Sequence, residues 1–180
     1  MFAELLTENL YERIDGKPYD RSDFHHDPTR YRCVFRYYLP HCDMLINGIY
    51  WDVKMDRLFS ENDTRMPAFK PKVIADISCD INGSVPITIK DTKISDPVFG
   101  YDPVSMQECA PYQDHSIDIM SVSNLPAELP RDASEGFGAM LIEYVIPELL
   151  KSESAIVDNA TICSHGKLRP EFEYLADYAY

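Results

Sequence analysis

Glycine is scarce in this sequence, and glycine-rich phosphate-binding turns are absent. The seven glycines stand at positions 16, 48, 83, 100, 136, 138 and 166. A doubly wound dinucleotide site should carry G-x-G-x-x-G between its first strand and helix, but Gly136-Phe137-Gly138 is not followed by a third glycine. The P-loop, the nucleophile elbow and the HExxH helix are missing as well. The chain therefore lacks the helix N-terminus that usually holds a pyrophosphate.

Membrane and metal signatures are also missing. No apolar run approaches the ~20 residues that span a bilayer, and the start Met-Phe-Ala-Glu has no basic leader region. We therefore expect a cytoplasmic protein without membrane contact. The five cysteines are an odd number without C-x-x-C spacing. This pattern predicts reduced thiols and neither a disulfide framework nor a metal site.

The charge is strongly negative. Thirty acidic residues against 17 basic ones give a net charge of −13, which repels phosphate backbones and argues against a nucleic-acid partner. The acids are spread along the chain, as on a solvated surface. With 180 residues, of which 45% are hydrophobic, the chain is long enough for one compact domain and too short for two full ones.

One stretch, residues 72–85, combines a buried strand with a polar loop. Its β-branched start predicts a core strand, and its acids, small polar residues and glycine predict the loop. In open α/β sheets, ligands bind outside the carboxyl ends of the strands. The residues in that position are Asp76, Cys79, Asp80, Asn82 and Ser84. The alternative is a structural loop in which the aspartates cap backbone N–H groups.

Two further strands have polar ends. Residues 43–46 form an apolar run before Asn47-Gly48, and residues 117–122 precede Ser123-Asn124. Both runs predict buried strands, and parallel strands need crossover connections. We therefore predict an α/β fold, a partial Rossmann-like parallel sheet with flanking helices. Right-handed connections would bring the three strand ends to one edge of the sheet and so form a shared cleft.

The remaining segments are expected to form helices and loops. The aromatic stripe of Tyr31, Val34, Phe35 and Tyr38 predicts a helix from Pro28 to Pro40. Other helices are predicted at 2–13, 60–65, 130–150 and 168–178, a further strand at 156–162, and extended pieces with loops at 86–115. The core face predicted for helix 130–150 consists of Phe137, Met140, Leu141, Tyr144, Val145 and Leu149.

Three blocks of sequence resemble a known enzyme family. They are LINGIYW (45–51), IADISCDINGS (74–84) and NLPAELPRDASE (124–135). These blocks look like the lysine-ketoglutarate reductase part of the bifunctional lysine-degrading enzyme, within the wider alanine dehydrogenase, saccharopine dehydrogenase and transhydrogenase group. The likeness runs from about Tyr11 to Tyr174 and covers only the C-terminal part of the family's chain.

The resemblance implies roles for the two parts of the chain. Residues 1–125 would form the later part of a nicotinamide-nucleotide-binding domain, and residues 126–180 the returning C-terminal helical segment of the substrate domain. Asp80 would be the catalytic-site acid beside the nicotinamide and the substrate, although Ile81 and Asn82-Gly83 depart from the family pattern. The candidate cofactor-binding residues are Asn47, Gly48, Asp76, Ser78, Asn124 and Leu125. The family's catalytic Lys and His, and its glycine-rich turn, belong to a preceding portion.

The implied activity is NAD(P)-dependent hydride transfer to the imine that joins lysine to 2-oxoglutarate. Because the pyrophosphate-binding turn is missing, we expect the isolated chain to be inactive and to bind NAD or NADP weakly or not at all. The alternatives are an alanine dehydrogenase, a lysine-forming saccharopine dehydrogenase, or a non-catalytic interaction module that keeps the fold. The expected partners are an amino-acid or 2-oxo-acid substrate and either a separate N-terminal half chain or further copies of this chain.

Overall fold

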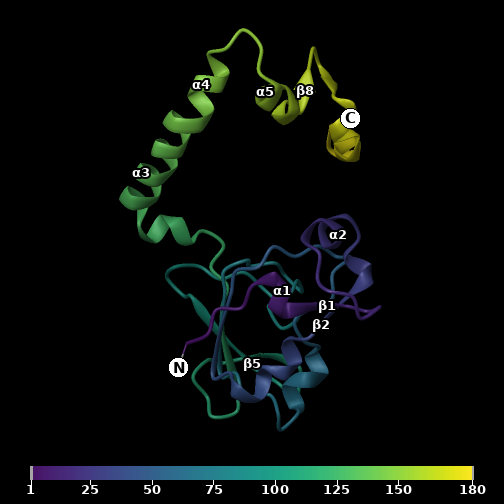
Figure 1. Ribbon diagram of the computed structural model, residues 1–180. Helices are drawn as coiled ribbons and strands as arrows, with labels where there is room; N and C mark the ends of the chain where they lie inside the picture. The colour runs from purple at the N-terminus through teal and green to yellow at the C-terminus, as the bar shows by residue number, and fades with distance from the viewer. Residues whose placement is uncertain (1, 180) are drawn as a thin grey trace. The chain divides into compact units, whose positions relative to one another are not determined.

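The computed structural model describes residues 2–179, and the chain divides into two compact units, Met1–Glu128 and Leu129–Tyr180 (Figure 1). None of the described helices has the length and apolar character required to cross a membrane. The first unit contains the predicted strands, and the second contains the predicted long helix.

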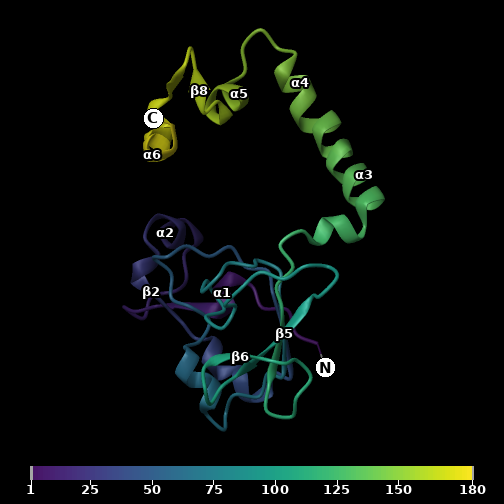
Figure 2. The ribbon, with the colours of Figure 1, turned by 180° about the vertical axis from the view of Figure 1, so that it is seen from behind.

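A five-stranded sheet organises the first unit, in the order β3-β4-β7-β5-β6. β3 runs parallel to β4 and β4 runs parallel to β7, whereas β5 and β6 are antiparallel additions on the far side of β7 (Figure 2). The strands are β3 (Met44–Asn47), β4 (Val73–Asp76), β7 (Ile117–Met120), β5 (Val98–Asp102) and β6 (Gln107–Cys109). The α/β prediction and its three parallel strands are confirmed. The sheet is mixed because the segment predicted as extended pieces supplies a hairpin.

The strand register places the core on one face of the sheet. Leu45, Ile74, Ile119 and Phe99 stand opposite one another across β3, β4, β7 and β5, and the last three are 0–2% exposed. Side chains alternate between the two faces of a strand, so every second residue joins this core. Burying an aliphatic side chain of this size contributes about 1.5–3 kcal/mol.

The N-terminal segments are short, and the helix predicted from Pro28 to Pro40 is wrong. Tyr31–Cys33 (β2) pairs antiparallel with Tyr11–Arg13 (β1), and short 3₁₀ turns surround it. These elements are α1 (Thr7–Leu10), α2 (Arg21–His26), η1 (Pro28–Arg30), η2 (Phe35–Tyr37) and η3 (Leu39–His41). The helix predicted at residues 2–13 was likewise too long, because only α1 is helical there. The rings of Tyr11 and Tyr31 both pack on Phe24, with centroids 4.9 and 5.0 Å away, and this tertiary cluster overrides the helical spacing.

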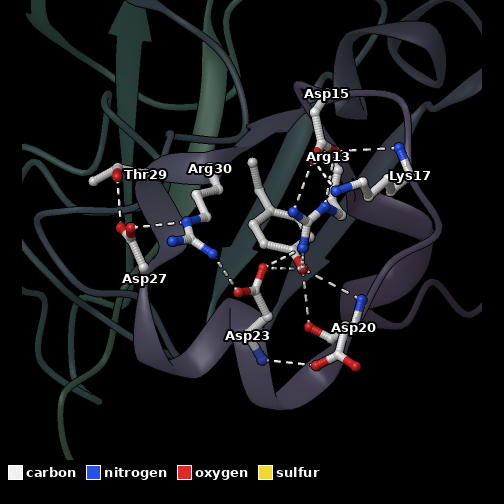
Figure 3. A network of polar contacts seen from close by, with 9 residues as sticks. Arg13, Asp15, Lys17, Asp20, Asp23, Asp27, Thr29 and Arg30 are labelled. Carbon is white, nitrogen blue, oxygen red and sulfur yellow. Dashed lines mark hydrogen bonds and ion pairs between the residues drawn. The ribbon is translucent and has the colours of Figure 1, made fainter.

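A polar network fixes the same N-terminal segment (Figure 3). Asp23 accepts hydrogen bonds from the guanidinium groups of Arg13 and Arg30, the latter at 2.7 Å. The Tyr31 hydroxyl lies 3.1 Å from the Asp23 carboxylate. Arg13 also binds Asp15 through two contacts of 2.9 Å. These contacts join β1, α2 and β2, so the network is structural.

Two further 3₁₀ helices belong to the first unit, and the first of them was predicted. The helix predicted at 60–65 is the 3₁₀ helix η4 (Glu61–Arg65), and the Ser60 side chain caps it by accepting from Asp63 N–H. A last 3₁₀ helix, η5 (Leu125–Glu128), ends the unit. Because capping groups satisfy backbone N–H donors that the helix cannot, Ser60 defines where η4 begins.

The second unit contains the predicted long helix and lacks the predicted strand at 156–162. The helix runs through α3 (Pro130–Met140), the π-helical turn η6 (Leu141–Val145) and α4 (Ile146–Leu149). Pro147 has no N–H to continue the α-helical pattern, which explains a wider turn there. The remaining elements are α5 (Ala155–Ala160), β8 (Cys163–Ser164), β9 (Lys167–Leu168), η7 (Pro170–Leu175) and α6 (Ala176–Ala179).

Two sequence expectations for this unit need correction. Residues 155–160 are helical because the Ser154 side chain accepts from Val157 N–H and caps the helix. The predicted core face of helix 130–150 is largely exposed, with Phe137 at 67% and Met140 at 60%. A unit this small buries too little surface to cover such a face by itself. The helix predicted at 168–178 corresponds to η7 and α6.

Candidate functional site

The carboxyl ends of β3, β4 and β7 lie at the same edge of the sheet. The register pairs Asn47 with Asp76, the last residues of β3 and β4, and β7 runs parallel beside β4. The prediction that the polar segments after these strands meet at one edge is therefore confirmed. Ligands of open α/β sheets bind at such edges, so we treat this edge as the candidate site.

A buried network of side chains closes the ends of β3 and β4. Asn47 Nδ2 lies 2.8 Å from Asp76 Oδ1, 2.9 Å from Ser78 Oγ and 2.8 Å from Ser84 Oγ. The Thr88 hydroxyl donates to Asp76 Oδ2 at 2.6 Å. Asn47 and Asp76 are only 2% and 1% exposed. Because a buried carboxylate is costly unless it is hydrogen-bonded, this network holds the loop that follows β4 in one position.

One atom of this network has no partner. Asn47 Oδ1 is buried and accepts no hydrogen bond from any described residue. The N–H groups of the Asn47 amide face Asp76, Ser78 and Ser84, so the amide oxygen faces away from these three residues. The side chain of Asn47 therefore acts within the protein, as a support for the loop.

The loop after β4 has a constrained backbone. Cys79 and Asn82 both have left-handed backbone angles, with φ of 57° and 53°, a conformation that costs energy for residues other than glycine. A methyl group on Gly83 would lie 2.4 Å from Asp80 Cβ, so only glycine fits at that position. Gly83 N–H donates to the Asp80 carbonyl at 2.9 Å. Strain of this kind persists only where the surrounding structure supports it.

Asp80 lies at the tip of this constrained loop and is exposed. Its carboxylate forms no hydrogen bond or ion pair with the described residues, in contrast to Asp76. A rigid loop that presents a free carboxylate at a strand edge can bind an ammonium or orient a polar ligand. This geometry agrees with the role that the resemblance implies for Asp80, and that role stays a prediction.

Cys79 ties the loop to the end of β7. Its Sγ lies 3.1 Å from the carbonyl oxygen of Val122, two residues beyond β7. Burial raises the pKa of the Cys79 thiol, and the negative charges of Asp76, Asp80 and Asp91 raise it further. The thiol is therefore protonated at neutral pH and donates its hydrogen bond. The same three acids give this edge a negative field.

The other predicted residues flank the edge. Gly48 is exposed just after β3, and Asn124 is exposed just before η5, which begins with the half-buried Leu125. Asn124 accepts a hydrogen bond from Ala127 N–H at 3.1 Å through its carbonyl. The structure thus brings all the predicted residues to three neighbouring strand ends.

Sequence reasoning missed Thr88. Its hydroxyl completes the hydrogen bonding of Asp76, yet it lies in the buried stretch Ser84–Thr88, twelve residues after its partner. The only available signal was a single polar residue that follows Val85, Pro86 and Ile87. A threonine in such an apolar run needs a buried partner, but the partner's identity depends on tertiary contacts.

The chemistry of this edge fits one end of a nicotinamide dinucleotide and not the other. The network contains carboxylates, hydroxyls and an amide but no basic side chain. An acidic edge is compatible with an oxidised nicotinamide ring, which is cationic, and with an amine substrate. It does not suit a pyrophosphate, which needs N–H donors or basic groups. This chemistry suits the nicotinamide end, which the resemblance implies for Asp80, Asn124 and Leu125, whereas the resemblance implies a position near the adenosine ribose for Asn47 and Gly48.

A hollow of the first unit lies away from these strand ends. It has a volume of about 510 Å³ and is lined by residues between Cys33 and Asp63, including Arg36, Arg57 and Ser60. No predicted site residue lines it. Its acids and bases are mixed, so it carries no clear ligand preference.

Comparisons with known proteins find relatives of one kind. The chain is 31% identical over 194 residues to the mitochondrial alpha-aminoadipic semialdehyde synthase of Mus musculus, and this alignment covers 93% of the chain. It is 29% identical over 182 residues to the alpha-aminoadipic semialdehyde synthase of Arabidopsis thaliana. The chain is homologous to one segment of the lysine-ketoglutarate reductase and saccharopine dehydrogenase family. The family resemblance seen in the sequence is thereby confirmed.

The match to this family covers only part of each relative. The alignments span 21% of the mouse synthase and 17% of the Arabidopsis synthase. The NAD⁺-dependent, L-lysine-forming saccharopine dehydrogenase of Schizosaccharomyces pombe is 28% identical over 128 residues, which cover 69% of this chain and 31% of that enzyme. No protein-family model matches the chain. The chain therefore corresponds to less than one third of the length of each of these three relatives.

Proposed function

We propose that this chain supplies the nicotinamide-facing and substrate-facing edge of an NAD(P)-dependent oxidoreductase that forms saccharopine from lysine and 2-oxoglutarate. The observation that carries the proposal is the meeting of three parallel strand ends, with the free carboxylate of Asp80 on a constrained loop. The homology to lysine-ketoglutarate reductase and saccharopine dehydrogenase enzymes supplies the reaction class.

In this proposal the residues of the edge have two kinds of role. Asp80 attracts the substrate ammonium or orients the nicotinamide, while Gly48, Asn124 and Leu125 line the cofactor. Asn47, Asp76 and Ser78 are positioning residues, because their side chains are engaged in the network beneath the loop. When bound, the cofactor supplies the hydride that reduces the imine between lysine and 2-oxoglutarate.

The isolated chain should bind the cofactor weakly, because the pyrophosphate-binding turn is not part of its sequence. Titration of the ¹⁵N-labelled chain with NADH and with NADPH should shift the backbone resonances of Gly48, Asp80, Asn124 and Leu125. The variant Asp80→Asn should change these shifts without changing the fold. Shifts confined to residues outside the strand ends would contradict the proposed site.

The isolated chain should also be inactive. Incubation with lysine, 2-oxoglutarate and reduced cofactor should give no oxidation above the buffer rate. Turnover by the 180 residues alone would show that the reaction does not require the missing pyrophosphate-binding turn. That result would overturn this part of the proposal.

Two alternatives have specific support. The match to the Schizosaccharomyces pombe enzyme favours a lysine-forming saccharopine dehydrogenase, and product analysis of a full-length enzyme that contains this segment would separate the two reactions. Exposed apolar side chains on β3 and β4, with Met44 at 58%, Ile46 at 63% and Val73 at 36%, favour an interaction module without chemistry. An alanine dehydrogenase gains no support from the relatives named above. The name of the mouse relative includes "mitochondrial" and that of the Arabidopsis relative does not, so the cytoplasmic location stays a prediction.

A further inference from the structure

A small pocket lies between helix α2 and the loop that follows β3. Its volume is about 120 Å³, roughly the volume of four water molecules. Two of the residues that line it, Phe24 and Met55, are buried and give it an apolar base. None of the residues predicted for the candidate site lines this pocket. It is therefore a separate feature, with room for one small functional group of a ligand.

Three basic side chains and a phenol border the pocket. His25 and His26 end α2, and Tyr50 and Lys54 belong to the loop after β3. Within the described part of the chain, no carboxylate forms an ion pair with these two histidines or with Lys54, whereas three arginines of the same N-terminal region all pair with acids. The chain as a whole carries a net charge of −13. A group of basic side chains without acid partners is thus a local site of attraction for an anion.

The two walls of the pocket are held together by Tyr11. Its ring packs on Phe24 of α2, with the centroids 4.9 Å apart, and its hydroxyl donates to the Asp56 carbonyl at 2.8 Å, at the end of the loop. Within the loop, the Trp51 indole N–H donates to the Met55 carbonyl at 3.2 Å. The polar network of Figure 3 also fixes α2 to β1. Because the pocket is already formed, a ligand does not have to order it.

The side chains of the pocket favour an oxyanion over a metal ion. In the described residues, no three His, Cys, Asp or Glu side chains are placed to hold a metal. Lysine, histidine and tyrosine all donate hydrogen bonds, and such bonds to charged oxygens are strong. One acid, Asp52, also lines the pocket, and its carboxylate accepts from Lys54 N–H at 2.9 Å. Its charge repels a doubly charged phosphate more than a singly charged carboxylate.

We propose that this pocket binds a carboxylate group of a small organic acid, through hydrogen bonds from Lys54 and the two histidines. The binding uses neither a dinucleotide nor the residues at the strand ends. Its failure would therefore leave the proposed function untouched, and failure of the proposed function would leave this inference untouched.

The test is an NMR titration of the 180-residue chain with glutarate, without dinucleotide. The resonances of His25, His26 and Lys54 should shift and reach saturation. Sodium chloride at the same ionic strength should not reproduce these shifts, because it screens charges without forming the directed hydrogen bonds of a carboxylate.

Two pairs of variants make the test specific. Lys54→Gln should weaken glutarate binding by about tenfold, the effect of losing one hydrogen bond to a charged group. The matched control, Lys70→Gln, removes the same charge at an exposed lysine outside the pocket and should bind within about twofold of the unsubstituted chain. His26→Gln and its control His41→Gln, also exposed and outside the pocket, should differ in the same direction. All four side chains are exposed, and an unchanged amide spectrum verifies the fold of each variant.

Several results would overturn the proposal. They are shifts that do not saturate, shifts confined to the strand ends, and equal effects of the pocket substitutions and their controls. Inorganic phosphate is the competing probe. Tighter binding of phosphate than of glutarate at the same residues would show that the pocket does not select a carboxylate.

Discussion

Asn47 Nδ2 lies 2.8 Å from Asp76 Oδ1, and the two residues are register partners at the ends of parallel strands. The contact joins the strand ends directly beneath the loop that carries Asp80. It makes the candidate site depend on a buried amide and a buried carboxylate, which are 2% and 1% exposed.

Removal of the Asn47 amide should destabilise the first unit. Asn47→Ala leaves the buried Asp76 carboxylate with fewer hydrogen bonds, and an unsatisfied buried charge of this kind costs about 3 kcal/mol. Urea unfolding of the variant and the unsubstituted chain measures the difference. The control is Asn62→Ala at an exposed position, which should change stability by less than about 0.5 kcal/mol. Equal stability of the two variants would show that the network does not hold the loop.

Gly83→Ala should distort the loop. The added methyl group would lie 2.4 Å from Asp80 Cβ and 2.9 Å from the Asp80 carbonyl oxygen, and such overpacking costs about 1–3 kcal/mol. Thermal unfolding measures the loss, and NMR shifts of Asp80 report the altered loop. At Gly48 a methyl group meets nothing within 4 Å, so Gly48→Ala should leave the melting temperature nearly unchanged. A Gly83→Ala variant as stable as Gly48→Ala would contradict the tight packing described here.

The ion pairs of Arg13 should make stability depend on acid pH. A side-chain hydrogen bond from Arg13 lowers the pKa of Asp15. Because the pKa of Asp15 is lower in the folded state than in the unfolded state, the ionised carboxylate stabilises the fold at pH values above the ordinary carboxyl pKa. This contribution disappears as the pH falls through the pKa of the folded state. The melting temperatures of the unsubstituted chain and of Asp15→Asn should therefore differ most near neutral pH and converge in strong acid. Melting temperatures that differ by the same amount at neutral pH and in strong acid would contradict a contribution from this ion pair.

Alkylation should distinguish the cysteines. Burial raises the pKa of Cys33 to about 11, so its reactive thiolate is rare near neutral pH. Cys163 is exposed and should react first with iodoacetamide at pH 8. Peptide mass spectrometry over time gives the order, and Cys163→Ser should remove the fast phase. If Cys33 reacted as fast as Cys163, the packing around β2 would be looser than described.

The raised pKa of Cys33 also predicts loss of stability in alkali. The folded state favours the neutral thiol of Cys33. The contribution of this thiol to the unfolding free energy is therefore complete at pH values below the ordinary thiol pKa, and it declines as the pH rises toward about 11. The difference in unfolding free energy between the unsubstituted chain and Cys33→Ala should shrink over that range. A difference that stays constant from pH 8 to alkaline pH would contradict burial of this thiol.

The local sequence was sufficient to predict the parallel strands and the polar residues that follow them. Runs such as Val73–Asp76 and Ile117–Met120 have β-branched residues and polar ends, and the direction of parallel strands then brings their carboxyl ends to one edge. The long helix from Pro130 to Leu149 was also readable, because its apolar spacing and its proline start are local features. The similarity of the three sequence blocks at 45–51, 74–84 and 124–135 indicated the family.

Tertiary structure alone decided how these residues are used. The pairing of Tyr31–Cys33 with Tyr11–Arg13 replaced a predicted helix, because a strand partner and an aromatic cluster outweigh helical spacing. Burial of Asn47 and Asp76 and exposure of Asp80 follow from which side of the loop packs on Thr88 and Ser84. Periodicity specifies which residues share a face of a strand. Which face is covered depends on contacts between segments far apart in the chain, and those contacts left the face with Ile46 exposed.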